Sequence, residues 1–218
     1  MKQYTPYIFL LALAQMTTVI AVAQEKNIGK IISYKKIPGG IEGKTATAIF
    51  DVHVYNDHII RVRVAKNKQF RNFSFALTDN TIPKFDQVSI QETEMAIELS
   101  TAGINAIIEK TPAFRVIFKN KSGAIINEDV QGDCFGTSFS GDKVTVYKTM
   151  QEGERFVGLG EALGNLDRRG TGVTLNNTDT YKYGDARLSM YSSIPFYMGI
   201  HHQQQYGIFY NNSYKTFF

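Results

Sequence analysis

The chain of 218 residues has little with which to cross-link itself or to bind a polyanion. Its single cysteine, Cys134, excludes an internal disulfide bond. Its 24 lysines and arginines are scattered among 20 acidic residues, with a formal net charge of +4 and no basic block. A scattered charge of this size indicates a solvated surface and argues against a nucleic-acid partner. Packing must therefore stabilise the folded domain.

The sequence also lacks the motifs of the common catalytic and metal sites. No Ser-His-Asp set, phosphate-binding loop or metal-ligand spacing is visible. His53 and His58 flank a predicted turn, and His201 and His202 adjoin one another before a run of glutamines. Adjacent residues on a strand point to opposite faces, which is poor geometry for one metal ion. We expect these histidines to be solvated, and we predict no metal and no cofactor.

No segment of twelve or more residues has the 3.6-residue apolar period of a helix. Apolar residues alternate instead with polar ones in short stretches, which end at turn-forming residues such as Pro38-Gly39-Gly40. The predicted strands are 29–37, 46–55, 60–64, 73–77, 87–101, 104–110, 114–119, 124–130, 143–150, 194–201, 206–210 and 214–218. Many short strands without helices predict an all-β fold, an antiparallel β-sandwich.

The N-terminus has the pattern of a signal peptide. Lys2 precedes an apolar run that ends in Ala21-Val22-Ala23, a small-x-small cleavage pattern. A membrane anchor would need about 20 apolar residues, and Gln15 interrupts the run. We predict a signal peptide over residues 1–23, one domain over residues 24–218, and an exported product, periplasmic or secreted, without a stable membrane span.

The stretch from Gly158 to Pro195 shows neither the 3.6-residue apolar period of a helix nor the alternation of a strand. A segment of this length inside a compact domain is usually a functional loop or disordered. Disordered segments have few aromatic residues, whereas this one contains Tyr181, Tyr183 and Tyr191. We interpret it as a functional loop on a β-scaffold. The tyrosines there and in the following strands could form a platform for a sugar, although amphipathic strand residues explain most of them.

Several short motifs follow one another in and after this loop. They are Gly158-Leu159-Gly160-Glu161, Leu166-Asp167-Arg168-Arg169-Gly170, Asn177-Thr178-Asp179, Ser193-Ile194-Pro195-Phe196 and Tyr206-Gly207-Ile208-Phe209. In this order they resemble the N-terminal domain of glycoside hydrolase family 31, the α-glucosidase and α-xylosidase family. The resemblance implies a galactose mutarotase-like sandwich placed before a catalytic (β/α)₈ barrel.

In that family two barrel aspartates perform retaining hydrolysis, one as nucleophile and one as general acid/base. Both lie downstream of the matching region, so the resemblance implies that this chain has no catalytic residue. The family's sandwich continues for several more strands, whereas this chain stops at Phe217-Phe218. We therefore expect a truncated sandwich with an exposed edge, and a barrel domain missing from this chain but present in its parent protein.

The resemblance also implies a substrate contact. The family's loop aspartate, which lies beside the cleaved bond, corresponds to Asp179, and Thr180 could add a donor. A carboxylate offers two acceptor oxygens to sugar hydroxyls. The aromatic residue that usually precedes this motif is replaced by Asn176, which puts stacking on the sugar in question. Alternatively, Asp179 caps a turn. We expect Glu161 to accept backbone N–H groups at the base of the loop.

Three functions remain open from the sequence. The first is the non-catalytic N-terminal part of an exported α-glycosidase that acts on an oligosaccharide or α-glycoside. The second is a free-standing carbohydrate-binding module. The third is a mutarotase-like epimerase, which needs a general acid and a general base facing one groove. The placement of the histidines argues against the third.

Overall fold

The structure is a computed structural model that describes residues 26–66, 69–79, 81–132, 136–179, 181 and 190–218. None of these residues is helical, and the part of the chain so described contains no helix able to span a membrane. The all-β prediction is confirmed. The predicted signal peptide, Cys134 and Thr180 lie outside the described residues.

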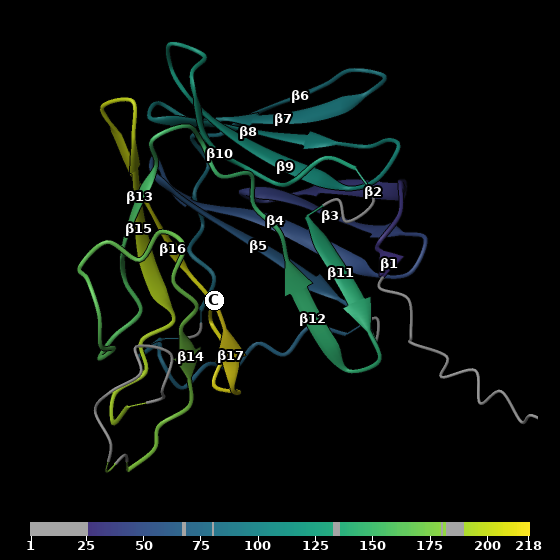
Figure 1. The fold of residues 1–218 in the computed structure, drawn as a ribbon. Helices are drawn as coiled ribbons and strands as arrows, with labels where there is room; N and C mark the ends of the chain where they lie inside the picture. Colours follow the sequence, from purple (N-terminus) through teal and green to yellow (C-terminus); the bar gives the residue numbers. More distant parts are fainter. Residues whose placement is uncertain (1–25, 67–68, 80, 133–135, 180, 182–189) are drawn as a thin grey trace, which may run out of the picture.

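Two antiparallel sheets stack face to face (Figure 1). One sheet has the strand order β2-β3-β4-β5 and the other β10-β9-β8-β7-β6. Their bounds are β2 Ile31–Ile37, β3 Gly40–Thr45, β4 Ile49–Asn56, β5 Ile59–Ala65, β6 Ser89–Glu92, β7 Ala96–Ser100, β8 Ile104–Glu109, β9 Arg115–Asn120 and β10 Ile125–Glu128. Within each sheet, strands that are consecutive in sequence pair with one another, which is the pattern of linked hairpins.

The core of the molecule lies between these two sheets. Phe50, Val52 and Val54 alternate along β4 and are completely buried against residues of β7, β8 and β9. The ring of Phe50 lies 4.8 Å from that of Phe114, centroid to centroid, just before β9. The alternation in the sequence therefore gave the correct inward face.

The opposite face of β4 is covered as well, against expectation. Asp51 and His53 point away from the core, yet both are buried. The Arg63 Nε donates to Asp51 Oδ2 at 2.8 Å, while the Arg63 guanidinium lies over the ring of Phe70 at 4.3 Å. The prediction that His53 is solvated is wrong because side chains of β5 and the segment after it cover this face. His58 is exposed, as predicted.

The strand predictions fail where local pattern and tertiary pairing disagree. Residues 73–77 form no strand, and the side chains of Phe73 and Phe75 are largely exposed. By contrast, the predicted strand end at Pro38-Gly39-Gly40 is confirmed, because β2 ends at Ile37 and Gly39 turns the chain into β3. β3 was missed because glycines and charged residues break its alternation. The predicted strand 87–101 is a hairpin of β6 and β7.

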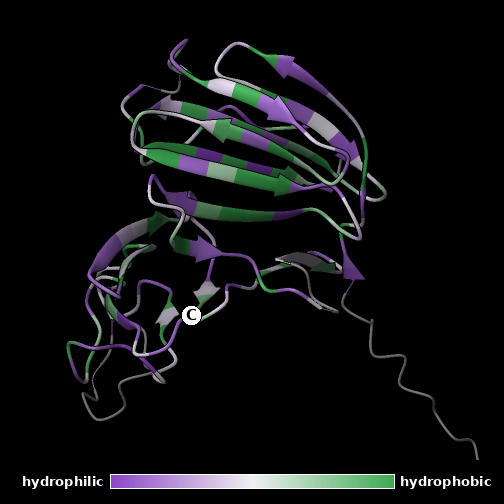
Figure 2. Cartoon of the chain, turned by 90° about the horizontal axis from the view of Figure 1, so that it is seen from above, coloured by the Kyte–Doolittle hydropathy of each residue, from purple (hydrophilic) through white to green (hydrophobic). Residues whose placement is uncertain are grey.

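Three smaller sheets lie beside the sandwich (Figure 2). They are formed by β1 Lys26–Asn27, β11 Thr137–Ser140 and β12 Lys143–Val146; by β13 Arg155–Gly158, β15 Phe196–His201 and β16 Gln204–Phe209; and by β14 Thr174–Leu175 and β17 Thr216–Phe217. β17 is the strand that we expected to lack neighbours. It pairs with β14, a short strand inside the predicted loop.

Candidate functional site: the loop of residues 158–195

At the base of the loop, the backbone of residues 158–161 passes very close to the backbone of residues 192–196. Leu159 N donates to Phe196 O at 2.8 Å, and Glu161 N donates to Ser192 O at 3.0 Å. A Cβ atom at Gly158 would lie 2.6 Å from Phe196 O, and Gly158 has a φ of 125° that only glycine adopts easily. The Gly-Leu-Gly-Glu motif therefore closes the loop at its base.

A second, small apolar cluster holds the loop against the β-scaffold. Leu159, Val173 and Leu175 are buried together, and the partly buried side chains of Tyr197 and Phe218 pack on them. Leu159 has a φ of 69°, a left-handed conformation that is uncommon for leucine. Burial of its side chain offsets the cost of that conformation.

Asp167 has the structural role that we predicted for Glu161. Its carboxylate accepts from Arg155 Nη1 at 2.6 Å, from Phe156 N at 3.2 Å and from Arg169 N at 3.0 Å. These donors, the Arg155 guanidinium first, lower the pKa of Asp167 to about 2. The Glu161 side chain is exposed, and no described residue donates a hydrogen bond to its carboxylate. The prediction for Glu161 is wrong because the N–H groups of Phe156 and Arg169 are directed at the carboxylate of Asp167 instead.

The two arginines of the Asp-Arg-Arg-Gly motif bind backbone rather than solvent. Arg168 Nη1 and Nη2 donate to Leu163 O at 2.7 Å and to Ala162 O at 2.8 Å. Arg169 Nη1 donates to Glu154 O at 2.6 Å. In a regular strand, neighbouring strands would bind these carbonyl groups. In this irregular segment the arginine side chains of the motif bind them instead.

A buried polar network supports the scaffold beneath the loop. Glu154 is 1% exposed and accepts from the Tyr206 hydroxyl at 2.6 Å and from Gln151 N at 2.7 Å. His201 Nε2 lies 3.9 Å from the same carboxylate and 2.8 Å from Ile126 O. No sequence pattern singles out Glu154, because its partner Tyr206 lies 52 positions away in the chain.

His201 is the second histidine for which the prediction of solvation is wrong. It is 5% exposed, because the end of β15 packs against β10. A carbonyl oxygen only accepts, so His201 Nε2 must donate to Ile126 O. In the neutral ring Nδ1 is then an acceptor, and His202 Nδ1, 3.2 Å away, is the donor. His201 therefore has a structural role, whereas His202 is exposed, as predicted.

Three of the six tyrosines described in this region, Tyr197, Tyr206 and Tyr210, are packed, whereas Tyr181, Tyr191 and Tyr214 are exposed. The ring of Tyr197 lies 5.7–6.4 Å from the rings of Phe156, Tyr206, Tyr210 and Phe218, centroid to centroid. Burial raises the pKa of Tyr197 and of Tyr206, and raises the pKa of Tyr210 to about 12. These rings form packing contacts, as the sequence suggested.

Asp179 lies exposed near the end of the described part of the loop. Thr178 N donates to Met190 O at 3.0 Å, which brings the two sides of the loop together. The Tyr191 hydroxyl then donates to Asp179 Oδ1 at 3.0 Å. The described residues provide no backbone N–H to this carboxylate, so the turn cap that we considered is not seen among them.

Tyr191 is the residue that the sequence analysis failed to connect with Asp179. Asn176 occupies the position of the expected aromatic residue, and its Nδ2 donates to Thr178 Oγ1 at 3.1 Å. The fold instead places an aromatic ring beside Asp179 from the other side of the loop. The described residues contain no cluster of acidic, histidine or cysteine side chains that could hold a metal ion.

Comparison with known proteins identifies the family of this scaffold. A profile of the glycosyl hydrolase 31 N-terminal galactose mutarotase-like domain matches residues 49–218. The chain belongs to this family. An alpha-glucosidase 2 from Bacillus thermoamyloliquefaciens is 31% identical over 176 residues, which are 79% of this chain and 22% of that enzyme.

Solved structures of the family agree with the fold. A GH31 dextranase from Flavobacterium johnsoniae, complexed with isomaltotriose, is 26% identical with a TM-score of 0.78, over 88% of this chain and 23% of that one. The cycloalternan-forming enzyme from Listeria monocytogenes, in complex with a pentasaccharide substrate, is 13% identical with a TM-score of 0.66, over 81% and 17%. At 13% identity the second likeness shows the fold alone. The chain spans about a fifth of the length of these relatives.

Proposed function

We propose that this chain is the N-terminal domain of an exported α-glycosidase, and that its loop shapes the sugar subsites of a catalytic barrel carried by the parent protein. Membership of the family and the identity with an alpha-glucosidase support the class of enzyme. The dextranase complex with isomaltotriose supports an oligosaccharide or α-glycoside as the substrate. Hydrolysis itself would be performed by barrel carboxylates, and this chain would contribute binding.

The exposed pair of Asp179 and Tyr191 is the observation that carries this proposal. Asp179 Oδ1 is occupied by the Tyr191 hydroxyl, which fixes the orientation of the carboxylate. A carboxylate has acceptor sites for about four hydrogen bonds, so others remain for sugar hydroxyls. The loop is tied to β13 of the scaffold by the ion pair of Asp167 with Arg155 and by Arg168 N, which donates to Phe156 O at 2.8 Å, so an exposed acceptor is mounted on a rigid support. Thr180 beside Asp179 is proposed as a donor.

The decisive experiment is Asp179→Ala in the barrel-bearing parent protein. Loss of a charged acceptor costs about 1.5–3 kcal/mol, which is roughly a ten- to hundredfold decrease in kcat/KM. The melting temperature should barely move, because the side chain is exposed and contacts no core residue. Asp142→Ala, at an exposed turn outside the loop, is the matched control and should leave both quantities unchanged. A lower melting temperature with unchanged kcat/KM would assign Asp179 to a turn and contradict the proposal.

The assignment of catalysis to the barrel can be tested on the chain by itself. We expect no hydrolysis of a chromogenic α-glucoside or α-xyloside by chain purified from a host without such enzymes. Turnover that follows the protein would contradict the assignment of catalysis to the barrel. A free-standing carbohydrate-binding module is the alternative, and a reading frame that continues into a barrel after codon 218 would exclude it.

Export is a separate part of the proposal. The Ala21-Val22-Ala23 pattern places cleavage before Gln24. N-terminal sequencing of the secreted product should therefore begin at Gln24. An exported protein that retains Met1 would contradict the cleavage site.

A further inference from the structure

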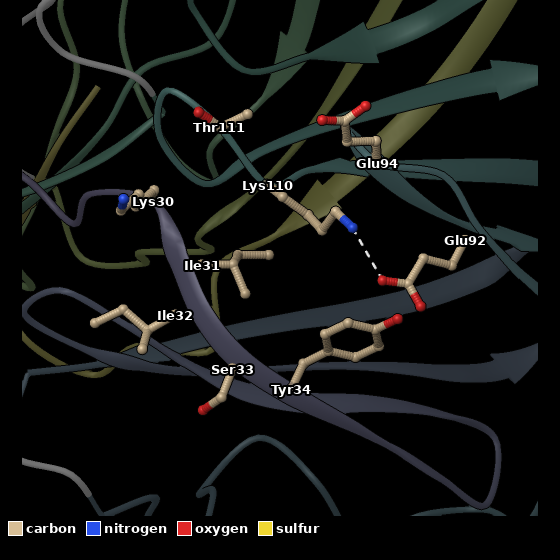
Figure 3. A pocket seen from close by; sticks show the side chains of 9 residues that line it. All are labelled: Lys30, Ile31, Ile32, Ser33, Tyr34, Glu92, Glu94, Lys110 and Thr111. Atoms are coloured by element: carbon tan, nitrogen blue, oxygen red, sulfur yellow. Dashed lines mark hydrogen bonds and ion pairs between the residues drawn. The ribbon is translucent and has the colours of Figure 1, made fainter.

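A polar groove lies on the sandwich (Figure 3). The residues that line it come from positions between 30 and 111, and none of them belongs to the loop. Its volume is about 510 Å³, within the range of about 300–1,000 Å³ that is typical of ligand sites. The lining residues are Lys30, Ile31, Ile32, Ser33, Tyr34, Glu92, Glu94, Lys110 and Thr111.

The groove exists because two edge strands approach one another without pairing along their length. β2 is the edge of one sheet, and β6 is the edge of the other. Ile31 N donates to Lys110 O at 2.9 Å, and the Lys36 ammonium donates to Ile90 O at 3.1 Å. These two bridges join the sheets at separate points of β2, and Tyr34 lies between them.

The carboxylate of Glu92 is held in a fixed orientation inside this groove. Lys110 Nζ donates to Glu92 Oε1 at 2.9 Å. Figure 3 shows this bond, and it shows the Tyr34 hydroxyl of β2 pointing toward the same carboxylate. The Glu92 side chain is 46% exposed, so its remaining acceptor sites can reach a ligand. Such second contacts pre-orient a binding group and reduce the entropy lost on binding.

The charges and apolar surfaces of the groove indicate the kind of ligand. Lys30 and Lys110 balance Glu92 and Glu94, so the groove favours neither a polyanion nor a metal cation. Ile32, 65% exposed, adds apolar surface beside these polar groups. Apolar surface with a few convergent donors and acceptors suits a neutral molecule that has hydroxyl groups and also an apolar face of C–H groups. A sugar ring has both.

We propose that this groove is a second carbohydrate-binding site, which takes a neutral oligosaccharide through the carboxylate of Glu92 and the hydroxyl of Tyr34. The choice of an oligosaccharide rests on the function proposed above, whereas the position of the site rests on the groove alone. It would hold a chain on the sandwich at a place separate from the loop.

The test follows the backbone amide resonances of the full chain during titration with isomaltotriose. At about 10 mM sugar, ten times a weak Kd of about 1 mM, we expect shifts at residues 31–34, 92–94 and 110–111. Glycerol at the same concentration should not reproduce them. Glu92→Gln keeps the shape of the side chain and removes its charge, and it should weaken binding at the groove about tenfold. Tyr34→Phe should have a smaller effect of the same sign.

A matched control uses another acidic residue that forms an ion pair with a lysine, on the facing sheet. Glu42 of β3 pairs with Lys35 at 2.7 Å, and Glu42→Gln makes the same change of charge outside the groove. It should leave the affinity unchanged. The spectra of all variants also report whether each one is folded.

The outcomes separate this inference from the proposed function. Shifts at the groove whose affinity Glu92→Gln weakens about tenfold and Asp179→Ala preserves support the second site, whatever the loop does. Shifts confined to residues 176–191 support the loop and overturn the groove. An absence of shifts at the groove, or equal binding by wild type and Glu92→Gln, also overturns it.

Discussion

The sandwich and the loop region are stabilised by different means. In the sandwich, side chains such as Phe50 and Leu99 alternate along regular strands and are completely buried between two sheets. In the loop region, the apolar cluster around Leu159 is small, and arginines and buried carboxylates bind individual backbone groups. A packed core tolerates many hydrophobic residues of suitable size. A backbone group in an irregular segment needs one particular partner, so recognisable motifs gather in the loop region.

This difference changes the meaning of the motifs that relate the chain to its family. Gly158 permits a close approach of two backbone segments, and Asp167 and Arg168 satisfy N–H and carbonyl groups. These residues form the support. Asp179 of the same motif set is exposed, and the Tyr191 hydroxyl donates to one of its carboxylate oxygens, so it is the residue for which we propose contact with a sugar. Residues that hold a binding group are therefore as recognisable in sequence as the group itself.

The largest effect should come from the core of the sandwich. Phe50→Ala removes a fully buried ring and its contact with Phe114, and should lower the free energy of unfolding by about 3–5 kcal/mol. Phe75→Ala removes the same group where it is 84% exposed and should change stability by less than about 0.5 kcal/mol. Chemical denaturation measures both. A similar loss for the two variants would show that the sheets are not the main source of stability.

The next largest effect should come from the polar support of the loop region. Glu154→Ala leaves the Tyr206 hydroxyl and Gln151 N buried without their acceptor, at a cost of about 1–3 kcal/mol for each unsatisfied group. Glu152→Ala, two residues away and exposed, is the control. Thermal unfolding measures the difference. Equal melting temperatures for the two variants would contradict a structural role for the buried carboxylate.

A smaller and more local effect is expected at Arg168. Arg168→Ala leaves the carbonyl groups of Ala162 and Leu163 without their donors, while the core of the sandwich is untouched. Cleavage by a protease within residues 158–195 should accelerate about tenfold, with little change in global unfolding. Arg71→Ala, at an exposed position, should not alter the pattern. Equal acceleration in the sandwich and in the loop would remove the distinction between the two regions.

The smallest effect is a dependence of stability on pH through His53. Burial is the main cause of its lowered pKa, below the ordinary value of 6.5. The unfolded chain therefore binds a proton in a pH range where the folded chain does not. Stability should fall as the pH drops below about 6.5 and level off below the folded pKa.

His53→Asn should remove this part of the pH dependence, and His58→Asn, at an exposed position, should retain it. Urea unfolding between about pH 5 and pH 8 measures the slope for each variant, because the unperturbed histidine pKa of about 6.5 lies inside this interval. An unchanged slope in His53→Asn would show that other groups set the pH dependence.

The sequence by itself determined the all-β class, the inward face of strands such as β4, and the family, because alternation and short motifs are local properties. It misplaced the strand at residues 73–77 and missed β3, whose glycines and charged residues follow no period. These errors have one cause: pairing with a neighbouring strand can override local preference.

Only the tertiary structure decided which polar residues are covered and which meet at a site. All three of His53, His58 and His201 lie near predicted turns in the sequence. His53 and His201 are nevertheless buried, because distant elements pack over them, whereas His58 is exposed. Asp179 meets Tyr191 because the two sides of the loop return to one another. The groove at Glu92 arises where the edges of two sheets approach. Contacts between residues far apart in the chain leave no periodic trace in the sequence, so packing alone creates them.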